Sequence, residues 1–205
     1  EEDDEPGVTS LIVQNDQFVM DASKPFQPFG PFPEVGSHFY IGSAEVFEKN
    51  VTELTLAIEW DGLPGSFPSH YEGYDLPANL PGADDFTVDI RLLQDNSWVS
   101  IKPAEGAPDT VTRETLFVEE TGGTLSSEKM VTLTGGDDDD LHLQEPRAID
   151  ELAPWQADTA NGFLRLTLNH AFYHDAYPSV LTRQTLAAGR LPDEMRGALY
   201  KSDDG

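Results

Sequence analysis

The sequence predicts a mainly β protein: a β-sandwich of the jelly-roll or immunoglobulin-like kind, with long loops and one short C-terminal helix. Three observations support this fold class. Short segments rich in β-branched and aromatic residues recur along the 205 residues, turn-forming residues separate them, and only a segment near the C-terminus has helical spacing. A chain of this length holds one substantial core, so we expect a single domain.

Alternation of apolar and polar residues predicts most of the strands. Residues 51–60 alternate with one slip near Glu53, and two segments flank Asp95-Asn96-Ser97, which is typical of a hairpin turn. An aromatic segment at 35–43 reads as a strand entering a packed sheet. The remaining predicted strands and the hairpin arms are 8–13, 86–93, 98–102, 115–119, 129–133 and 162–169.

Helical signals are few. Residues 44–49 predict one helical turn, because Ser43 has the side chain of an N-cap. Residues 179–188 have helical spacing, and we expect Gly189 to end this helix as its C′ residue. Between these two segments, residues 63–81 read as a long loop that Phe67, Tyr71 and Tyr74 anchor.

The most distinctive segment is an arm at residues 24–33, with the sequence Lys-Pro-Phe-Gln-Pro-Phe-Gly-Pro-Phe-Pro. Its four prolines fix φ and remove four backbone donors, so the arm is neither helix interior nor central strand. Phe26, Phe29 and Phe32 need apolar cover. We therefore expect a stiff, extended arm that lies on its own domain or on a neighbouring subunit.

The charge of the chain argues against two classes of partner. The formal net charge is −26, from 38 acidic and 12 basic side chains, which argues against nucleic acid and against membrane insertion. The spread of acidic residues along the chain predicts adaptation to high salt; a melting temperature that does not rise with added salt would refute this.

We expect a disordered acidic leader at 1–7, the sandwich at 8–190 and a tail at 191–205 that links to a further domain. With no cysteine, stability must come from packing.

Recognisable reaction centres are missing from the sequence. It contains neither of the glycine-rich phosphate loops nor the G-x-S-x-G elbow of acyl hydrolases. His170 and His174 have the spacing of a zinc helix but follow a strand and lack its glutamate, so we expect a structural role. The acidic run 135–140 does not match a calcium loop and reads as a solvated loop. We therefore expect no catalytic residue, cofactor, metal or small-molecule substrate.

Several motifs together resemble one family. The string K-P-F-Q-P-F-G-P-F-P-E-V-G-S-H-F-Y-I-G-S-A-E-V-F is followed by L-T-L-A-I-E-W-D-G-L-P, F-P-S-H-Y-E-G-Y and, later, G-F-L-R-L-T-L-N and F-Y-H-D-A-Y-P. This order resembles a middle domain of baseplate J-like proteins from contractile, phage-tail-like injection systems. The likeness covers most of 15–178, is strongest in the arm and is weak at 102–161. Tyr173 stands where the family often has glycine, and family members are much longer than this chain.

The resemblance implies a non-catalytic, structural role in the baseplate wedge. It also implies other baseplate or tail subunits as partners, and a protein that is cytoplasmic on synthesis and then assembled into a phage-tail-like particle. The candidate docking residues are Phe26, Phe29, Phe32, Tyr71 and Tyr74. An alternative is a carbohydrate-binding module whose aromatic loop stacks on sugar rings, although such aromatic residues more often fill a core.

Overall fold

A computed structural model of the chain describes residues 8, 10–51, 53–74, 76, 80–101, 112–134, 149 and 151–190. The predicted leader at 1–7, the acidic run 135–140 and the tail at 191–205 lie outside these residues.

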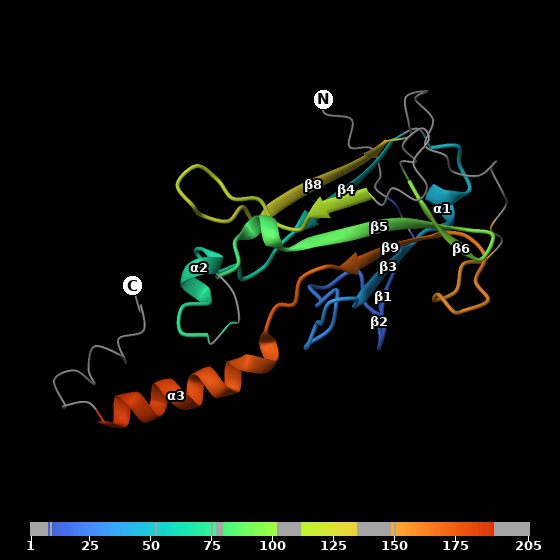
Figure 1. Ribbon diagram of the computed structural model, residues 1–205. Helices are drawn as coiled ribbons and strands as arrows, with labels where there is room; N and C mark the ends of the chain where they lie inside the picture. The colour runs from blue at the N-terminus through green and yellow to red at the C-terminus, as the bar shows by residue number, and fades with distance from the viewer. Residues whose placement is uncertain are drawn as a thin grey trace.

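Most of the described strands belong to one antiparallel sheet (Figure 1). Its order is β2-β1-β3-β9-β5-β6, and β7 also pairs with β5. The first half of β5 pairs with β7 and its second half with β6, so these two short strands share one edge of a longer strand. The bounds are β1 Ile12–Asn15, β2 Val19–Met20, β3 His38–Gly42, β5 Thr87–Gln94, β6 Ser97–Ser100, β7 Thr112–Thr115 and β9 Phe163–Leu168.

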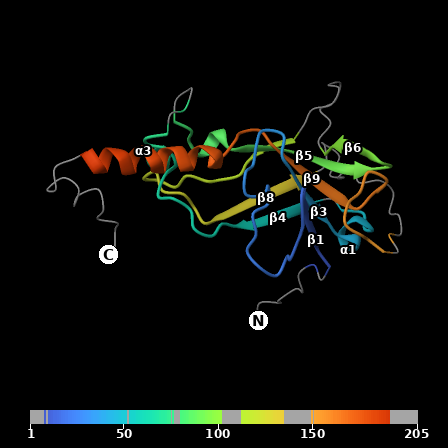
Figure 2. The same ribbon diagram turned by 90° about the horizontal axis from the view of Figure 1, so that it is seen from below.

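A second, two-stranded sheet packs over the inner face of the first (Figures 1 and 2). It consists of β4, Glu53–Glu59, and β8, Glu128–Thr134. The alternation of β4 turns every second side chain inward, and Leu54 and Leu56 lie opposite Leu133 and Val131. The fold is therefore mainly β, with the layers of a β-sandwich, and the fold-class prediction is confirmed.

The main core fills the space between the two sheets. Phe86, Leu133 and Leu168 are fully buried there, and they are joined by side chains from the loops. A smaller cluster covers the outer face of the large sheet, where Tyr40 and Phe163 pack with partly buried tryptophans. Gly42 lies against the ring of Phe163 so closely that a Cβ atom would overlap it, which explains the glycine there.

Two helical predictions are confirmed and one helix end is wrong. α1 spans Ala44–Phe47, and the Ser43 hydroxyl accepts a hydrogen bond from the Val46 N–H at 3.3 Å. α3 spans Tyr177–Arg190, so Gly189 lies inside the helix rather than ending it. The long loop holds a further one-turn helix, α2, Phe67–His70, and two 3-10 turns occur at η1, Ala83–Asp85, and η2, His174–Ala176. Within the described residues no helix has both the length and the apolar character to cross a membrane.

The hairpin prediction is confirmed with a shorter turn, since Ser97 already belongs to β6, whereas several strand boundaries differ from those predicted. Asp95 and Asn96 both have positive φ, at 45° and 62°, as a two-residue type I′ turn requires. β1 begins later than the predicted segment 8–13 and continues to Asn15, which pairs with Phe39. β7, Thr112–Thr115, ends where the predicted segment 115–119 begins, and within that segment Glu119 forms only an isolated bridge with Leu125.

Candidate docking surface

The arm does not run straight. The Gly30 N–H donates to the Gln27 carbonyl at 3.1 Å and closes a turn with Pro28 in its second position, where a fixed φ is favourable. Gly30 has φ +82°, a conformation that glycine adopts without strain. The expectation of an extended arm is therefore wrong in this part: prolines stiffen the segment, but the Pro-Phe-Gly sequence also makes it bend.

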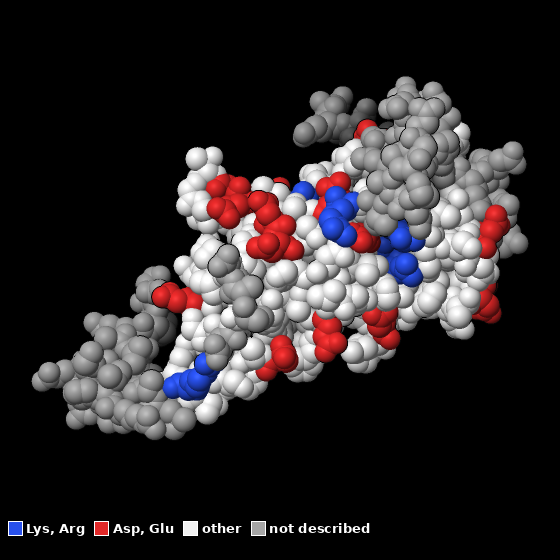
Figure 3. All heavy atoms as spheres, in the orientation of Figure 1, with Lys and Arg blue, Asp and Glu red and all other residues white. Residues whose placement is uncertain are grey.

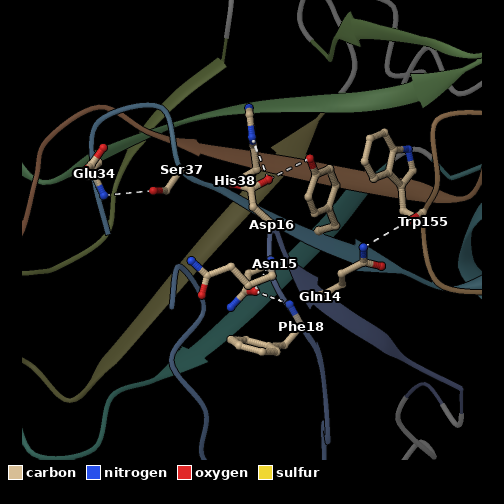
Figure 4. Close-up of polar contacts among 10 residues, drawn as sticks. Gln14, Asn15, Asp16, Phe18, Glu34, Ser37, His38 and Trp155 are labelled. Carbon is tan, nitrogen blue, oxygen red and sulfur yellow. Dashed lines mark hydrogen bonds and ion pairs between the residues drawn. The ribbon is translucent and has the colours of Figure 1, made fainter. Parts of the chain in front are cut away.

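Asn15 ties the arm to the sheet, and Figure 4 draws its contact with Phe18. Its side chain is buried, and its Oδ1 accepts hydrogen bonds from the N–H groups of Gln17 at 2.9 Å and Phe18 at 2.8 Å. The Nδ2 group of the same side chain donates to the Gln27 carbonyl at 3.5 Å. One buried amide thus fixes both the β1–β2 turn and the first bend of the arm.

The three arm phenylalanines have different surroundings. Phe29 is 8% exposed and meets the Phe39 ring at 6.1 Å in an edge-on arrangement. Phe26 lies 5.7 Å from the same ring but remains 37% exposed. Phe32 is 67% exposed. The middle phenylalanine therefore anchors the arm to its own domain, and the outer two present their rings to solvent.

A second clamp holds the far end of the arm. His174, from η2, makes a hydrogen bond of 3.0 Å between its Nδ1 and the Pro31 carbonyl. His170 instead makes its Nδ1 contact, of 2.9 Å, with the Ala171 carbonyl and packs against Phe86. Each imidazole therefore makes a structural contact with a different backbone carbonyl. The described part of the chain contains no group of three or more potential metal-binding side chains.

Sequence reasoning missed a polar cluster beside this arm, drawn in Figure 4. The Asp16 carboxylate accepts a hydrogen bond from the His38 N–H at 2.8 Å and lies 3.1 Å from the His38 ring. It also accepts one from the Tyr40 hydroxyl at 3.3 Å. Burial, and then repulsion from Asp16, raise the pKa of Tyr40 to about 12. The only signal for this cluster was the Asn15-Asp16 turn, because its partners come from a strand more than 20 residues away.

The other aromatic candidates lie inside the protein. Residues 67–74, which we call the tyrosine loop, place Tyr71 in the core at 2% exposure, and its hydroxyl donates to the Phe172 carbonyl at 2.9 Å. Burial raises the pKa of Tyr71 well above its usual value. Tyr74 is half-buried and meets the Tyr71 ring edge-on at 5.2 Å. The prediction that these residues anchor a loop is confirmed, and the ring of Tyr71 is not available for stacking on a sugar.

Exposed apolar side chains concentrate near the arm. Of the 12 large hydrophobic side chains that are exposed in the described part of the chain, seven lie among its first 35 residues. Five of them lie on or beside the arm and the β1–β2 hairpin, which are blue in Figures 1 and 2. We call these five the arm surface: Phe18, Val19, Phe26, Phe32 and Val35.

This arrangement can bind but offers no reaction chemistry of its own. The residues of the arm surface are apolar and carry no nucleophile, acid or base, whereas two hydrogen-bonded clamps hold the backbone beneath them. No family model and no curated protein matches the chain.

Proposed function

We propose that the chain is a non-catalytic assembly domain of a baseplate protein from a contractile, phage-tail-like particle, and that the arm surface contacts a neighbouring baseplate or tail subunit. The observation that carries the proposal is the exposure of Phe32, at 67%, on an arm whose backbone is clamped at Gln27 and at Pro31. The motif order of the sequence supports the assignment to a baseplate protein, and the exposed rings of the arm support a contact with a neighbouring subunit.

Physical chemistry favours an interface at this position. Clusters of exposed apolar side chains on a soluble domain mark interaction sites, since each ring gains roughly 25 cal/mol per Å² when it leaves water. The arm is already ordered by Phe29, Asn15 and His174, so docking loses little backbone entropy. A rigid arm with two outward phenylalanines therefore fits a permanent contact better than transient ligand binding.

The test changes the two exposed rings and leaves the anchor intact. We expect Phe26→Ser with Phe32→Ser, introduced into the full-length parent protein, to prevent baseplate incorporation while the isolated domain keeps its fold. Electron microscopy of particles and incorporation of the tagged protein measure the first effect, and the thermal unfolding of the domain measures the second.

A matched control separates loss of docking from a general loss of apolar surface. Met130 is 62% exposed on β8, in the second sheet, and Met130→Ser should leave assembly normal. Normal particles from the phenylalanine double variant would refute the role of the arm surface. Failure of Met130→Ser to assemble would show that assembly does not depend specifically on the arm.

A further inference from the structure

Two arginines lie directly opposite each other on the outer face of the large sheet. Arg91 of β5 and Arg165 of β9 are cross-strand partners in the antiparallel ladder. The residues on either side of Arg165, Leu164 and Leu166, belong to the main core, so Arg165 points to the other face of the sheet. Like charges directly opposite each other destabilise a sheet, and the chain has only 12 basic side chains to place. The stability of the sheet therefore does not explain this pair.

Trp98, in β6, contacts both guanidinium groups. The Cζ atom of Arg165 lies 4.5 Å from the centroid of the Trp98 ring, and the Trp98 carbonyl accepts a hydrogen bond from Arg91 Nη1 at 3.3 Å. The Trp98 ring in turn packs against the rings of Tyr40 and Trp155, with centroids 5.8 and 6.0 Å away. An aromatic cluster that is fixed by its own packing therefore positions the Arg165 guanidinium.

Arg165 has no anionic partner within the part of the chain that the structure describes. It belongs to no ion pair there, and its buried Nε atom has no hydrogen-bond partner. Burial lowers the pKa of the Arg165 guanidinium below its usual value. A partly buried charge without a partner is costly, so an orphaned donor of this kind points to a group that the chain itself does not supply.

Two carboxylates at the same face of the sheet are engaged by other donors. Asp16 accepts hydrogen bonds from β3, as Figure 4 shows. Asp89 accepts hydrogen bonds from the Nε and Nη2 atoms of Arg113, at 2.7 and 3.2 Å. Figure 3 shows basic and acidic atoms close together over β5 and its neighbouring strands. Neither carboxylate is therefore available to Arg165.

We propose that the Arg165 guanidinium binds a carboxylate from outside the chain, with Trp98 holding the guanidinium in place and Arg91 adding positive charge beside it. A guanidinium presents paired N–H donors in one plane, which match the two oxygens of a carboxylate. The carboxylate comes either from a small organic acid or from an acidic side chain of a partner protein, and both sources present the same group. The inference goes beyond the proposed function, because it uses neither the arm surface nor the baseplate resemblance.

The test follows the arginine Nε–H resonances of the nitrogen-15-labelled 205-residue chain during titration. The net charge of −26 repels anions at long range, so the ionic strength is held at about 1 M, where the Debye length is ~3 Å. Sodium acetate that replaces sodium chloride is the probe for a free carboxylate. The peptide acetyl-Glu-Glu-Glu-amide, with acetyl-Gln-Gln-Gln-amide as its neutral control, is the probe for a protein side chain. We expect the Arg165 resonance to move and saturate with a carboxylate probe.

Three variants make the test specific. Arg165→Gln should abolish the saturable response, and Arg165→Lys, which keeps the charge but loses the paired donors, should weaken it by about tenfold. In these two variants the indole N–H resonance of Trp98 reports binding. Arg113→Gln removes the same charge from the same face, but Arg113 already binds Asp89, so this variant should respond like the unaltered chain. Thermal unfolding checks the fold of each variant, and Arg165→Lys carries the test if Arg165→Gln does not fold.

The two probes distinguish the source of the carboxylate. Equal affinity for acetate and for the acidic peptide would assign the site to a free organic acid, and tighter binding of the peptide would assign it to a partner protein. The inference is overturned if neither probe gives a saturable response or if the neutral peptide binds as well as the acidic one. It is also overturned if Arg165→Lys binds as tightly as the unaltered chain, or if Arg113→Gln loses as much affinity as Arg165→Gln.

Discussion

Two loops of this protein have similar composition and opposite exposure. The arm and the tyrosine loop are both rich in proline, glycine and aromatic residues, but the tyrosine loop buries Phe67 and Tyr71 at 4% and 2% exposure, whereas the arm leaves Phe32 at 67%. Phe67 meets the rings of Phe86 and Phe117 at 4.5 and 4.8 Å, so its loop completes the main core. The arm lies beside β3 and contributes mainly Phe29 to that core.

The difference shows that aromatic content does not decide whether a loop is structural or available for binding. What decides it is the number of rings that the loop places between the sheets, since buried rings stabilise the fold and exposed rings stabilise a complex. A substitution in the tyrosine loop should therefore change the free energy of unfolding, whereas one at an exposed ring of the arm should change the free energy of binding.

The largest effect on folding is expected at Tyr71. Tyr71→Ala removes a fully buried ring and leaves the Phe172 carbonyl without its donor, so it should lower the free energy of unfolding by about 3–5 kcal/mol. Tyr71→Phe keeps the ring and should cost about 1 kcal/mol. Phe32→Ala is the matched variant in the arm and should change stability by less than about 0.5 kcal/mol. Denaturant unfolding measures all three, and equal losses in Tyr71→Ala and Phe32→Ala would remove the contrast.

Within the arm, Phe29 should behave like a residue of the tyrosine loop. Phe29→Ala removes the ring that packs on Phe39 and should cost about 3 kcal/mol, whereas Phe26→Ala, with its ring partly in water, should cost about 1 kcal/mol. Urea unfolding of the two variants gives the difference. Similar values would mean that the arm is held by its backbone clamps rather than by Phe29.

The sequence was sufficient to predict the elements whose signals are local. The alternation in β4, the turn at Asp95-Asn96 and the Ser43 cap depend on neighbouring residues, and the structure has all three. The predicted end of α3 was wrong, because the helix continues through Gly189, and the predicted strand 115–119 was wrong in its limits, because β7 already ends at Thr115.

Which aromatic residues are exposed could not be predicted in the same way. Phe29 and Phe32 occupy equivalent places in a Pro-Phe repeat, and only the position of Phe39 in β3 makes one an anchor and the other a surface residue. The clamps from Asn15 and His174 join segments 12 and 143 residues apart. Such pairings depend on strand order, which the sequence pattern leaves open.

A smaller effect is expected where Asn15 fixes the arm. Asn15→Ala leaves the N–H groups of Gln17 and Phe18 without their acceptor and frees the first bend, so it should cost about 1–2 kcal/mol. Asp21 offers a control, because its carboxylate makes a similar local contact with the Ser23 N–H at 3.1 Å on an exposed turn. Asp21→Ala should cost less than about 0.5 kcal/mol.

Proteolysis of Asn15→Ala distinguishes a loss of order in the arm from a loss of stability of the whole domain. If the clamp orders the arm, proteolysis should cut the variant within residues 24–33 well below its unfolding midpoint, while Asp21→Ala stays resistant. Cleavage of both variants at the same rate would show that the arm does not depend on this amide.

The smallest effect concerns Tyr40, which connects the β1–β2 turn to β3. Its folded-state pKa of about 12 lies above the ordinary tyrosine value of 10.0, so the folded protein keeps a proton that the unfolded chain has lost between these values. This contribution to stability is fully present below about pH 10 and is lost as the pH rises toward about 12. Tyr40→Phe should remove that part of the pH dependence. Ultraviolet titration of the phenol, with unfolding followed in parallel, measures this change; a Tyr40 that ionises near pH 10 in the folded protein would show that Asp16 and burial do not hold its proton.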